Sequence, residues 1–332
     1  MQLAVFIAGR LVSYALVVLT SMTVVFILPR FLPTDPVEAL LARMLANSQF
    51  MDPAAVDAMR RSLSDAFGLQ GTLPEQYWHF MRRVLFTGDF GPSLSMFPTG
   101  VNALVRQALP WTLGLLGTST LIAWALGNFV GLLAGYRPRR RVSRALEGLA
   151  IVLYPIPYYI FSLLLIVLFC YVWPLFPITT TVQGTAPSPA WISSVLYNSF
   201  LPALSLVVGH VGWWLISMKA LSTSIAEEEF VNYARLRGVA DRRIMVHYVA
   251  RNALLPQITF LALQLGLIFS GAIITEVLFS YPGLGTLIYQ AVTQGDYNLM
   301  MGTITLSILA VATATLLVDL AYPLLDPRVR LR

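Results

Sequence analysis

The chain has 332 residues, of which 57% are hydrophobic and only 11% are charged. A soluble domain carries about 25% charged residues, so this composition excludes a water-exposed globular protein and favours an apolar exterior covered by lipid. The net charge of +6 could indicate a nucleic-acid partner, but uneven placement of arginines across a membrane explains it better, and no nucleic-acid partner is expected. The single cysteine, Cys170, excludes an intramolecular disulfide.

Six apolar segments are long enough to cross a bilayer. A hydrocarbon core of about 30 Å needs roughly 20 helical residues. The segments lie at about residues 11–32, 110–135, 148–172, 200–222, 255–279 and 299–325. The sequence therefore predicts an all-α polytopic membrane protein with six transmembrane helices. The first segment could be a signal peptide, but its apolar run is longer than a usual signal core and no small-x-small cleavage site closely follows Leu32, so a retained helix is expected.

The basic residues predict the orientation of these helices. If the N-terminus is cytoplasmic and the helices alternate, 15 of the 22 Lys and Arg residues fall on the cytoplasmic side and seven on the other. This bias agrees with the positive-inside rule. Both termini are therefore expected in the cytoplasm. The predicted segments are a cytoplasmic N-terminus at 1–10, a first transmembrane helix at 11–32, an outer loop at 33–108, a transmembrane domain at 109–325 that includes a cytoplasmic loop at 223–254, and a cytoplasmic C-terminus at 326–332.

The long loop after the first transmembrane helix has helical signals of its own. Asp52 can cap a helix that begins with Pro53, and a second helix is expected to start near Pro74. The residues at 88–92, Gly-Asp-Phe-Gly-Pro, predict a turn. Two interpretations stay open for this loop: a packed cap on the outer side, or a platform for a substrate-delivering protein.

The most polar segment of the later chain runs over residues 227–256. Glutamates at a helix start complement the positive end of its dipole, and Gly238 can end that helix in a left-handed conformation. Asp241 can then cap a second helix, which Pro256 ends or bends. The pattern predicts two short cytoplasmic helices that dock a soluble partner. An amphipathic connector on the lipid surface is the alternative. The candidate docking residues are Glu227, Glu228, Glu229, Phe230, Tyr233, Ala234, Arg235, Arg237, Gly238 and Asp241.

Four further features suggest local structure. Residues 155–157, Pro-Ile-Pro, are expected to kink the third transmembrane helix. The glycines at 127, 131 and 135 predict close helix packing, and a second chain is one candidate for the packing partner. Glu276 could contact a substrate, but a hydrogen bond to the adjacent turn is favoured. Asp319 is expected to pair inside the bundle or to lie near the inner interface.

Several kinds of chemistry lack their residues in this sequence. No Gly-x-x-x-x-Gly-Lys-Ser/Thr phosphate loop occurs, and the single lysine, Lys219, follows Leu-Ile-Ser-Met. His79, His210 and His247 are scattered, so no metal site is predicted. No catalytic residue, cofactor-binding residue or substrate-pathway residue can be assigned. If the protein depends on ATP, a separate subunit has to bind the nucleotide.

Six segments in the same order resemble the permeases of dipeptide and oligopeptide ABC importers. Thr34 replaces a glycine of the family pattern, and Tyr233 and Arg235 depart from the Glu-Ala-Ala of importers in general. The long loop after the first helix resembles the first of the two permease types. The matching segments are residues 32–37 (Leu-Pro-Thr-Asp-Pro-Val), 88–94 (Gly-Asp-Phe-Gly-Pro-Ser-Leu), 233–238 (Tyr-Ala-Arg-Leu-Arg-Gly), 251–256 (Arg-Asn-Ala-Leu-Leu-Pro), 276–285 (Glu-Val-Leu-Phe-Ser-Tyr-Pro-Gly-Leu-Gly) and 325–330 (Leu-Asp-Pro-Arg-Val-Arg).

The resemblance implies a non-enzymatic permease subunit of the bacterial inner membrane. Its expected partners are a related second permease, two ATP-binding subunits that hold ATP and Mg, a periplasmic substrate-binding protein and membrane lipid. The segment 227–256 would dock on an ATP-binding subunit. The resemblance implies peptides as substrates, with oligosaccharides, opines or another small solute as the alternative. A self-contained secondary transporter is the competing class, and a membrane-anchored enzyme lacks a catalytic set.

Overall fold

Long helices form the body of the protein. The computed structural model describes residues 2–31, 36–46, 52–138, 140–184 and 186–325; the Leu-Pro-Thr-Asp run at 32–35 and the C-terminal residues 326–332 lie outside them. Within the described ranges, five helical segments are long and apolar enough to span a membrane. They are Val5–Phe31 in α1 (Gln2–Ile27) and η1 (Leu28–Phe31), α5 (Val101–Tyr136), α8 (Pro189–Ala226), Asp241–Ser270, and Tyr297–Leu320 in α14 (Tyr297–Leu325).

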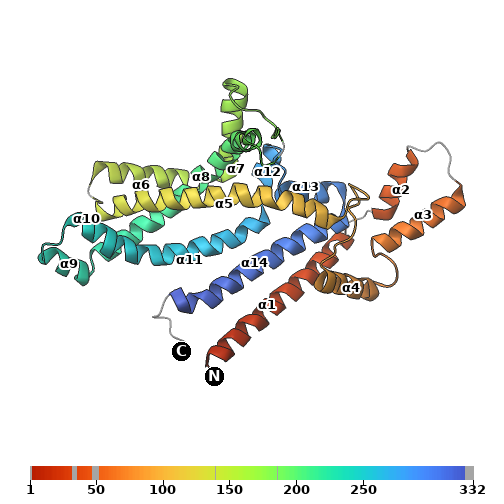
Figure 1. Cartoon of the computed structure of the whole chain (residues 1–332), viewed down its shortest axis with the longest axis horizontal. Helices are drawn as coiled ribbons and strands as arrows, with labels where there is room; N and C mark the ends of the chain where they lie inside the picture. Colours follow the sequence, from red (N-terminus) through yellow and green to blue (C-terminus); the bar gives the residue numbers. More distant parts are fainter. Residues whose placement is uncertain (1, 32–35, 47–51, 139, 185, 326–332) are drawn as a thin grey trace.

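These helices pack side by side (Figure 1). One end of the bundle carries α9 (Glu229–Leu236) and α10 (Asp241–Arg243). The opposite end carries α2 (Pro36–Ala46), α3 (Pro53–Ala66), α4 (Leu73–Arg82) and η2 (Arg83–Thr87), which together with the following segment 88–100 we call the outer cap. The predicted all-α, multi-span architecture is confirmed. Two of the helices, α5 and α8, are longer than the predicted segments 110–135 and 200–222, because helical structure continues beyond the apolar residues that a bilayer covers.

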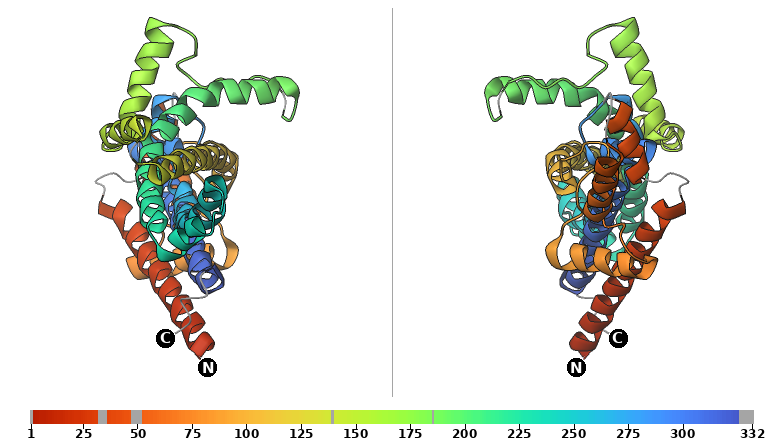
Figure 2. Two further views of the ribbon diagram at one scale, coloured as in Figure 1. Left: turned by 90° about the vertical axis from the view of Figure 1, so that its left-hand side faces the viewer. Right: turned by 90° about the vertical axis from the view of Figure 1, so that its right-hand side faces the viewer.

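The predicted third transmembrane helix is a sharply bent pair. The chain forms α6 (Arg141–Leu153), then α7 (Tyr158–Ile166) and η3 (Val167–Val172), with an angle of 91° between the two parts. This angle confirms the predicted kink at residues 155–157. The kink forms because proline removes a backbone donor and clashes with the preceding turn. Together the two parts are long and apolar enough to form the sixth span predicted over 148–172, but as a broken span and not as one continuous helix: α6 lies along α5, while α7 projects from the bundle (Figures 1 and 2).

The predicted fifth transmembrane helix, 255–279, has different boundaries. It begins earlier, with α10, η4 (Ile244–Ala250) and α11 (Arg251–Leu267), and it ends with η5 (Ile268–Ser270). Gly271 has a φ of 73°, which ends the helix, and α12 (Ile273–Leu278) starts after it. Pro256 lies inside α11 and does not end it. Apolar residues continue across Gly271, so hydropathy alone does not reveal the break.

A row of three glycines brings α5 and α8 into close contact. A Cβ added to Gly127 would lie 2.4 Å from the Trp214 Cβ. A Cβ on Gly131 would lie 2.6 Å from the Leu215 carbonyl oxygen, and one on Gly135 would lie 2.5 Å from the Lys219 carbonyl oxygen. The predicted close packing is therefore confirmed. Its partner is α8 of the same chain rather than a second permease.

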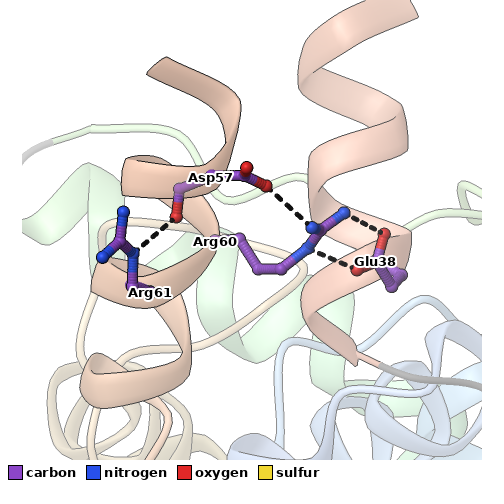
Figure 3. Close-up of polar contacts among 4 residues, drawn as sticks. All are labelled: Glu38, Asp57, Arg60 and Arg61. Carbon is purple, nitrogen blue, oxygen red and sulfur yellow. Dashed lines mark hydrogen bonds and ion pairs between the residues drawn. The ribbon is translucent and has the colours of Figure 1, made fainter. Parts of the chain in front are cut away.

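The outer cap has its own small core. Asp52 caps α3 as predicted, accepting a hydrogen bond of 3.2 Å from the Ala54 amide. Arg60 of α3 forms ion pairs with Glu38 of α2 at 2.7 Å and with Asp57 at 3.0 Å (Figure 3). Buried apolar residues lie beneath these pairs: Val37, Leu40, Leu41, Leu63, Phe67 and Leu94. These contacts favour a packed cap, and they leave its role as a platform untested.

Asp296, at the start of α14, fastens the outer cap to the bundle. Its side chain is fully buried. The Oδ2 atom accepts hydrogen bonds from the Ser93 hydroxyl at 2.5 Å, the Ser95 amide at 2.9 Å and the Ser95 hydroxyl at 2.8 Å. The Oδ1 atom accepts one from the Leu299 amide at 3.0 Å. The segment at 88–94 therefore ends in a turn that surrounds a buried carboxylate.

Candidate functional site

The predicted docking segment forms a short helix, α9, at one end of the bundle (Figure 1). Glu229 lies in its first turn, where a carboxylate complements the helix dipole, and Glu228 occupies the N-cap position. Two apolar side chains project from the helix into solvent, with Tyr233 63% exposed and Leu236 86% exposed. Such residues on a short surface helix provide a contact area for a partner. The sequence interpretation missed Leu236, because a lone exposed leucine has no distinguishing pattern.

The opposite side of α9 packs on the bundle. Val231 and Ala234 are buried, with 0% and 4% exposure, against Tyr136, Ile244 and Val249. Ala234 is therefore a packing residue of this segment, not part of its exposed face. The other nine candidate docking residues are exposed. Helical spacing grouped Ala234 with the aromatic residues, but only the packing shows which side faces inward.

Gly238 ends α9 in the predicted left-handed conformation. Its φ is 73°, and an added Cβ would meet nothing within 4 Å. The Val239 amide donates to the Ala234 carbonyl oxygen at 3.2 Å, and the Gly238 amide donates to that of Arg235 at 3.0 Å. These two bonds form a Schellman motif, which satisfies the free carbonyls of the last turn. The requirement for glycine is thus conformational and not steric.

Asp241 has a different role from the predicted helix cap. The N-cap residue is Ala240, which makes no side-chain capping bond. The Asp241 Oδ1 atom instead accepts a short hydrogen bond from the Tyr136 hydroxyl, and its Oδ2 atom lies 2.7 Å from Arg137 Nη2. The carboxylate is therefore directed to the end of α5. The expectation of two short docking helices is also wrong for the second helix, which continues from Asp241 into α11 as a single long helix.

A cavity of about 480 Å³ lies at the base of α9. The residues that line it include Arg137, Arg140, Arg235 and Glu227. Three guanidinium groups and one carboxylate give the cavity a positive balance. This end of the bundle can therefore receive acidic groups of a partner or of lipid.

The segment at 276–285 forms a second buried polar site. Glu276 Oε2 accepts a hydrogen bond of 2.7 Å from the Gly285 amide, and its Oε1 atom accepts one of 3.0 Å from the Thr112 hydroxyl. A Cβ on Gly283 would lie 2.3 Å from Oε2. The carboxylate thus holds the start of α13 (Leu284–Gln294), as favoured for a bond to the adjacent turn. This site has a structural role.

Two other predicted polar residues make internal contacts. Asp319 pairs with Arg10 at 2.8 Å, joining α14 to α1. His210 stacks on Tyr158 with ring centroids 5.7 Å apart, and its Nδ1 atom lies 2.7 Å from the Leu206 carbonyl oxygen. In the part of the chain that the structure describes, no group of three His, Cys, Asp or Glu residues is placed to hold a metal ion.

The chain matches the family model described as "Binding-protein-dependent transport system inner membrane component" over residues 127–331. It is 30% identical to a putative peptide permease protein of Brucella suis over 92% of both chains. It is 27% identical to the dipeptide transport system permease protein DppB of Bacillus subtilis over 99% of both chains. A glutathione transport system permease protein, GsiC of Pectobacterium atrosepticum, is 28% identical over 97% of both chains.

The matched region begins within α5 and includes the α5–α8 contact, the docking segment and the Glu276 site. Beyond that region, the matches to whole relatives extend to the outer cap and α1. The chain is therefore a member of the family of binding-protein-dependent transport system inner membrane components, and it is a multi-pass permease subunit of the ABC importer class.

Proposed function

We propose that this protein is the transmembrane permease subunit of an ATP-driven importer of di- or oligopeptides. The proposed assembly contains a related second permease, two ATP-binding subunits and a periplasmic substrate-binding protein. The names of the relatives, which include peptide, dipeptide and glutathione permeases, support this class of substrate. ATP and Mg would bind to the partner subunits, since the sequence has no phosphate loop.

One observation carries this proposal: α9 presents apolar residues to solvent while its inner side is packed. Phe230, Tyr233 and Leu236 are exposed, whereas Val231 is fully buried. Rigid contact with the bundle lets a force on the exposed face move the helices behind it. Phe230 also stacks on Tyr248 of η4, with 6.5 Å between ring centroids, which links α9 to the fifth span. We therefore place the ATP-binding subunit against α9.

The orientation follows from this placement. The end of the bundle that carries α9 faces the cytoplasm, and the outer cap faces the periplasm. Both termini are then cytoplasmic. The arginine-rich segments at 137–144 and 235–243 lie on the cytoplasmic side in this arrangement, as the positive-inside rule requires.

Reconstitution of the complete transporter in liposomes tests the proposal. Accumulation of a labelled peptide should need ATP, the two ATP-binding subunits and the binding protein, and the purified permease alone should hydrolyse no ATP. Uptake that survives ATP depletion but collapses with the proton gradient would favour a secondary transporter. ATP-dependent uptake of an oligosaccharide or opine, with peptides not transported, would keep the machinery and change the substrate.

A further inference from the structure

A further candidate binding site lies at the end of the bundle opposite to α9, and the proposed docking of the ATP-binding subunit does not involve it. A cavity of about 760 Å³ lies between the outer end of α1 and the helices of the outer cap. Three arginines line it, Arg30, Arg82 and Arg83, and Asp65 is the one carboxylate among its described lining residues. Aromatic side chains form part of its wall, among them Phe26, Phe80 and Phe86, and polar side chains such as Gln70, Gln76 and His79 form another part. The cavity thus combines positive charge with apolar surface.

Two of these arginines are incompletely satisfied. Arg30 donates to the Phe26 carbonyl oxygen at 2.6 Å and to Gln76 Oε1 at 3.0 Å, and its guanidinium carbon lies 3.4 Å from the centre of the Phe26 ring. Arg83 donates a long bond of 3.4 Å to the Phe90 carbonyl oxygen. The Nε–H groups of both side chains are buried without a hydrogen-bond partner. Buried donors of this kind are uncommon, and an anion nearby would stabilise them.

Burial also affects the Arg83 guanidinium. It lowers the pKa of this group, and the nearby Asp89 carboxylate offsets the effect only in part. Lowering the pKa of a cation by burial means that its charged form is incompletely compensated. A bound anion would restore that compensation.

The cavity lies beside the outer end of the first apolar span. Arg30 stands at the end of the apolar run Val5–Phe31. Figure 2 shows the orange segment of α4 and η2 lying across α1, and Phe26 near the end of α1 contacts Tyr77 and Phe80 of α4. From this crossing segment, Trp78 is 66% and Phe86 is 83% exposed. Exposed aromatic residues at the end of a transmembrane helix are typical of the headgroup layer.

We propose that this cavity binds the headgroup of an anionic phospholipid. The phosphate lies among Arg30, Arg82 and Arg83, and the glycerol and upper acyl chains lie along the exposed ring of Phe86. Three guanidiniums near one carboxylate favour an anionic headgroup over a zwitterionic one. The apolar wall and the exposed ring of Phe86 favour a lipid over a soluble phosphate or an acidic protein segment, since both of those would leave this surface in contact with water.

Native mass spectrometry of the full-length chain in detergent tests the proposal. The probes are phosphatidylglycerol, phosphatidylcholine with the same acyl chains, and soluble glycerol phosphate. We expect phosphatidylglycerol to bind roughly tenfold more tightly than phosphatidylcholine. Equal binding of the two lipids would overturn the proposal. Glycerol phosphate that competes as well as the intact lipid would also overturn it, because the site would then take a soluble anion.

Matched variants locate the binding. In Arg82→Gln/Arg83→Gln we expect phosphatidylglycerol to bind roughly tenfold more weakly, with phosphatidylcholine unchanged. The control, Arg60→Gln/Arg61→Gln, removes the same charge from the same cap. Arg60 is already paired with Glu38 (Figure 3), and neither Arg60 nor Arg61 lines the cavity. This control should keep the lipid preference. A preference that persists in the 82/83 variant, or that disappears equally in both variants, would overturn the assignment.

A fluorescence measurement on the unmodified site avoids the risk that a variant misfolds. Acyl-brominated phosphatidylglycerol should quench the Trp78 emission, taken as the difference between the parent chain and Trp78→Phe, more strongly than brominated phosphatidylcholine. Trp78 is exposed on α4 but does not line the cavity, so its replacement leaves the site intact. Equal quenching by the two lipids would contradict a selective site. If the 82/83 variant keeps its lipid preference but loses stimulation by the binding protein, the cavity instead receives an acidic segment of that protein.

Discussion

The hydroxyl group of Tyr136, the last residue of α5, donates a hydrogen bond to the carboxylate of Asp241, the first residue of α10. Arg137 holds the other carboxylate oxygen at 2.7 Å. These bonds join two segments that are 105 residues apart in the sequence. They fix the base of α9, because α9 lies between the end of α8 and Asp241 in the chain. The position of the proposed docking helix thus depends on a contact that does not belong to that helix.

Removing the Tyr136 hydroxyl should loosen α9 without disturbing the bundle. In Tyr136→Phe we expect the free energy of local unfolding of α9 to fall by about 1 kcal/mol, since one hydrogen bond to a partly exposed carboxylate is lost. Amide hydrogen exchange over residues 229–238 should then become about fivefold faster. The control, Arg242→Gln, changes an exposed charge next to Asp241 and should leave exchange unchanged. Equal exchange in Tyr136→Phe and the parent chain would show that the contact does not position α9.

Gly238 should tolerate asparagine better than alanine. Its backbone is left-handed, and open space surrounds the position of a Cβ, so any cost comes from the conformation alone. We expect Gly238→Ala to weaken the end of α9 by about 1 kcal/mol and Gly238→Asn by less. Gly238→Asp should disrupt transport and its coupling to ATP hydrolysis while the membrane bundle stays folded. Peptide uptake and ATPase activity of the reconstituted transporter measure this effect, and normal coupling in Gly238→Asp would count against the docking role.

The exposed apolar residues of α9 should contribute to binding of the ATP-binding subunit. Tyr233→Ala/Leu236→Ala removes two exposed side chains, so the chain should fold and insert normally. Loss of apolar anchors at an interface commonly costs more than 1 kcal/mol each, which predicts at least tenfold weaker association. Co-purification at graded subunit concentrations measures this. Leu73→Ala, an exposed apolar truncation at the opposite end, is the control. Unchanged association in the double variant would place the ATP-binding subunit elsewhere.

Two glycines of α5 should respond in opposite ways to alanine. At Gly131 the new Cβ would lie 2.6 Å from the Leu215 carbonyl oxygen, whereas at Gly117 it would meet nothing within 4 Å. We expect Gly131→Ala to lower the free energy of unfolding by about 1–3 kcal/mol through separation of α5 and α8. Gly117→Ala should be neutral or slightly stabilising, because alanine favours a helix. Thermal unfolding in detergent compares the two variants. A similar effect of both would show that helix propensity, and not packing, determines the result.

Asp296→Asn should release the outer cap. The Asp296 side chain accepts four hydrogen bonds in a fully buried site, three of them from Ser93 and Ser95. An asparagine offers one acceptor oxygen and directs an NH₂ group toward donors. We therefore expect the free energy that holds the outer cap on the bundle to fall by about 3 kcal/mol. Limited proteolysis of residues 52–100 should then become faster. Asp89→Asn, an exposed residue of the same cap that accepts a bond from the Gly91 amide, should have little effect.

The sequence was informative wherever one local rule decided the outcome. Asp52 and Pro53 predicted the start of α3, and Gly238 predicted the end of α9. The kink between α6 and α7 followed from the prolines at 155 and 157. Each of these depends on the backbone of a few neighbouring residues. The end of the fifth span at Gly271 was not predicted, because its flanks are equally apolar.

Composition and arginine placement determined, from the sequence alone, that this is a helical membrane protein and favoured one end as cytoplasmic. Bilayer thickness and the cost of burying charge act on every segment separately, so no tertiary contact is needed for that conclusion. Only the tertiary structure decided that Ala234 faces inward, that Asp241 binds Tyr136, and that the arginines of the outer cap line one cavity with Phe26. Those relationships join residues that are distant in the chain, and packing alone brings such residues together.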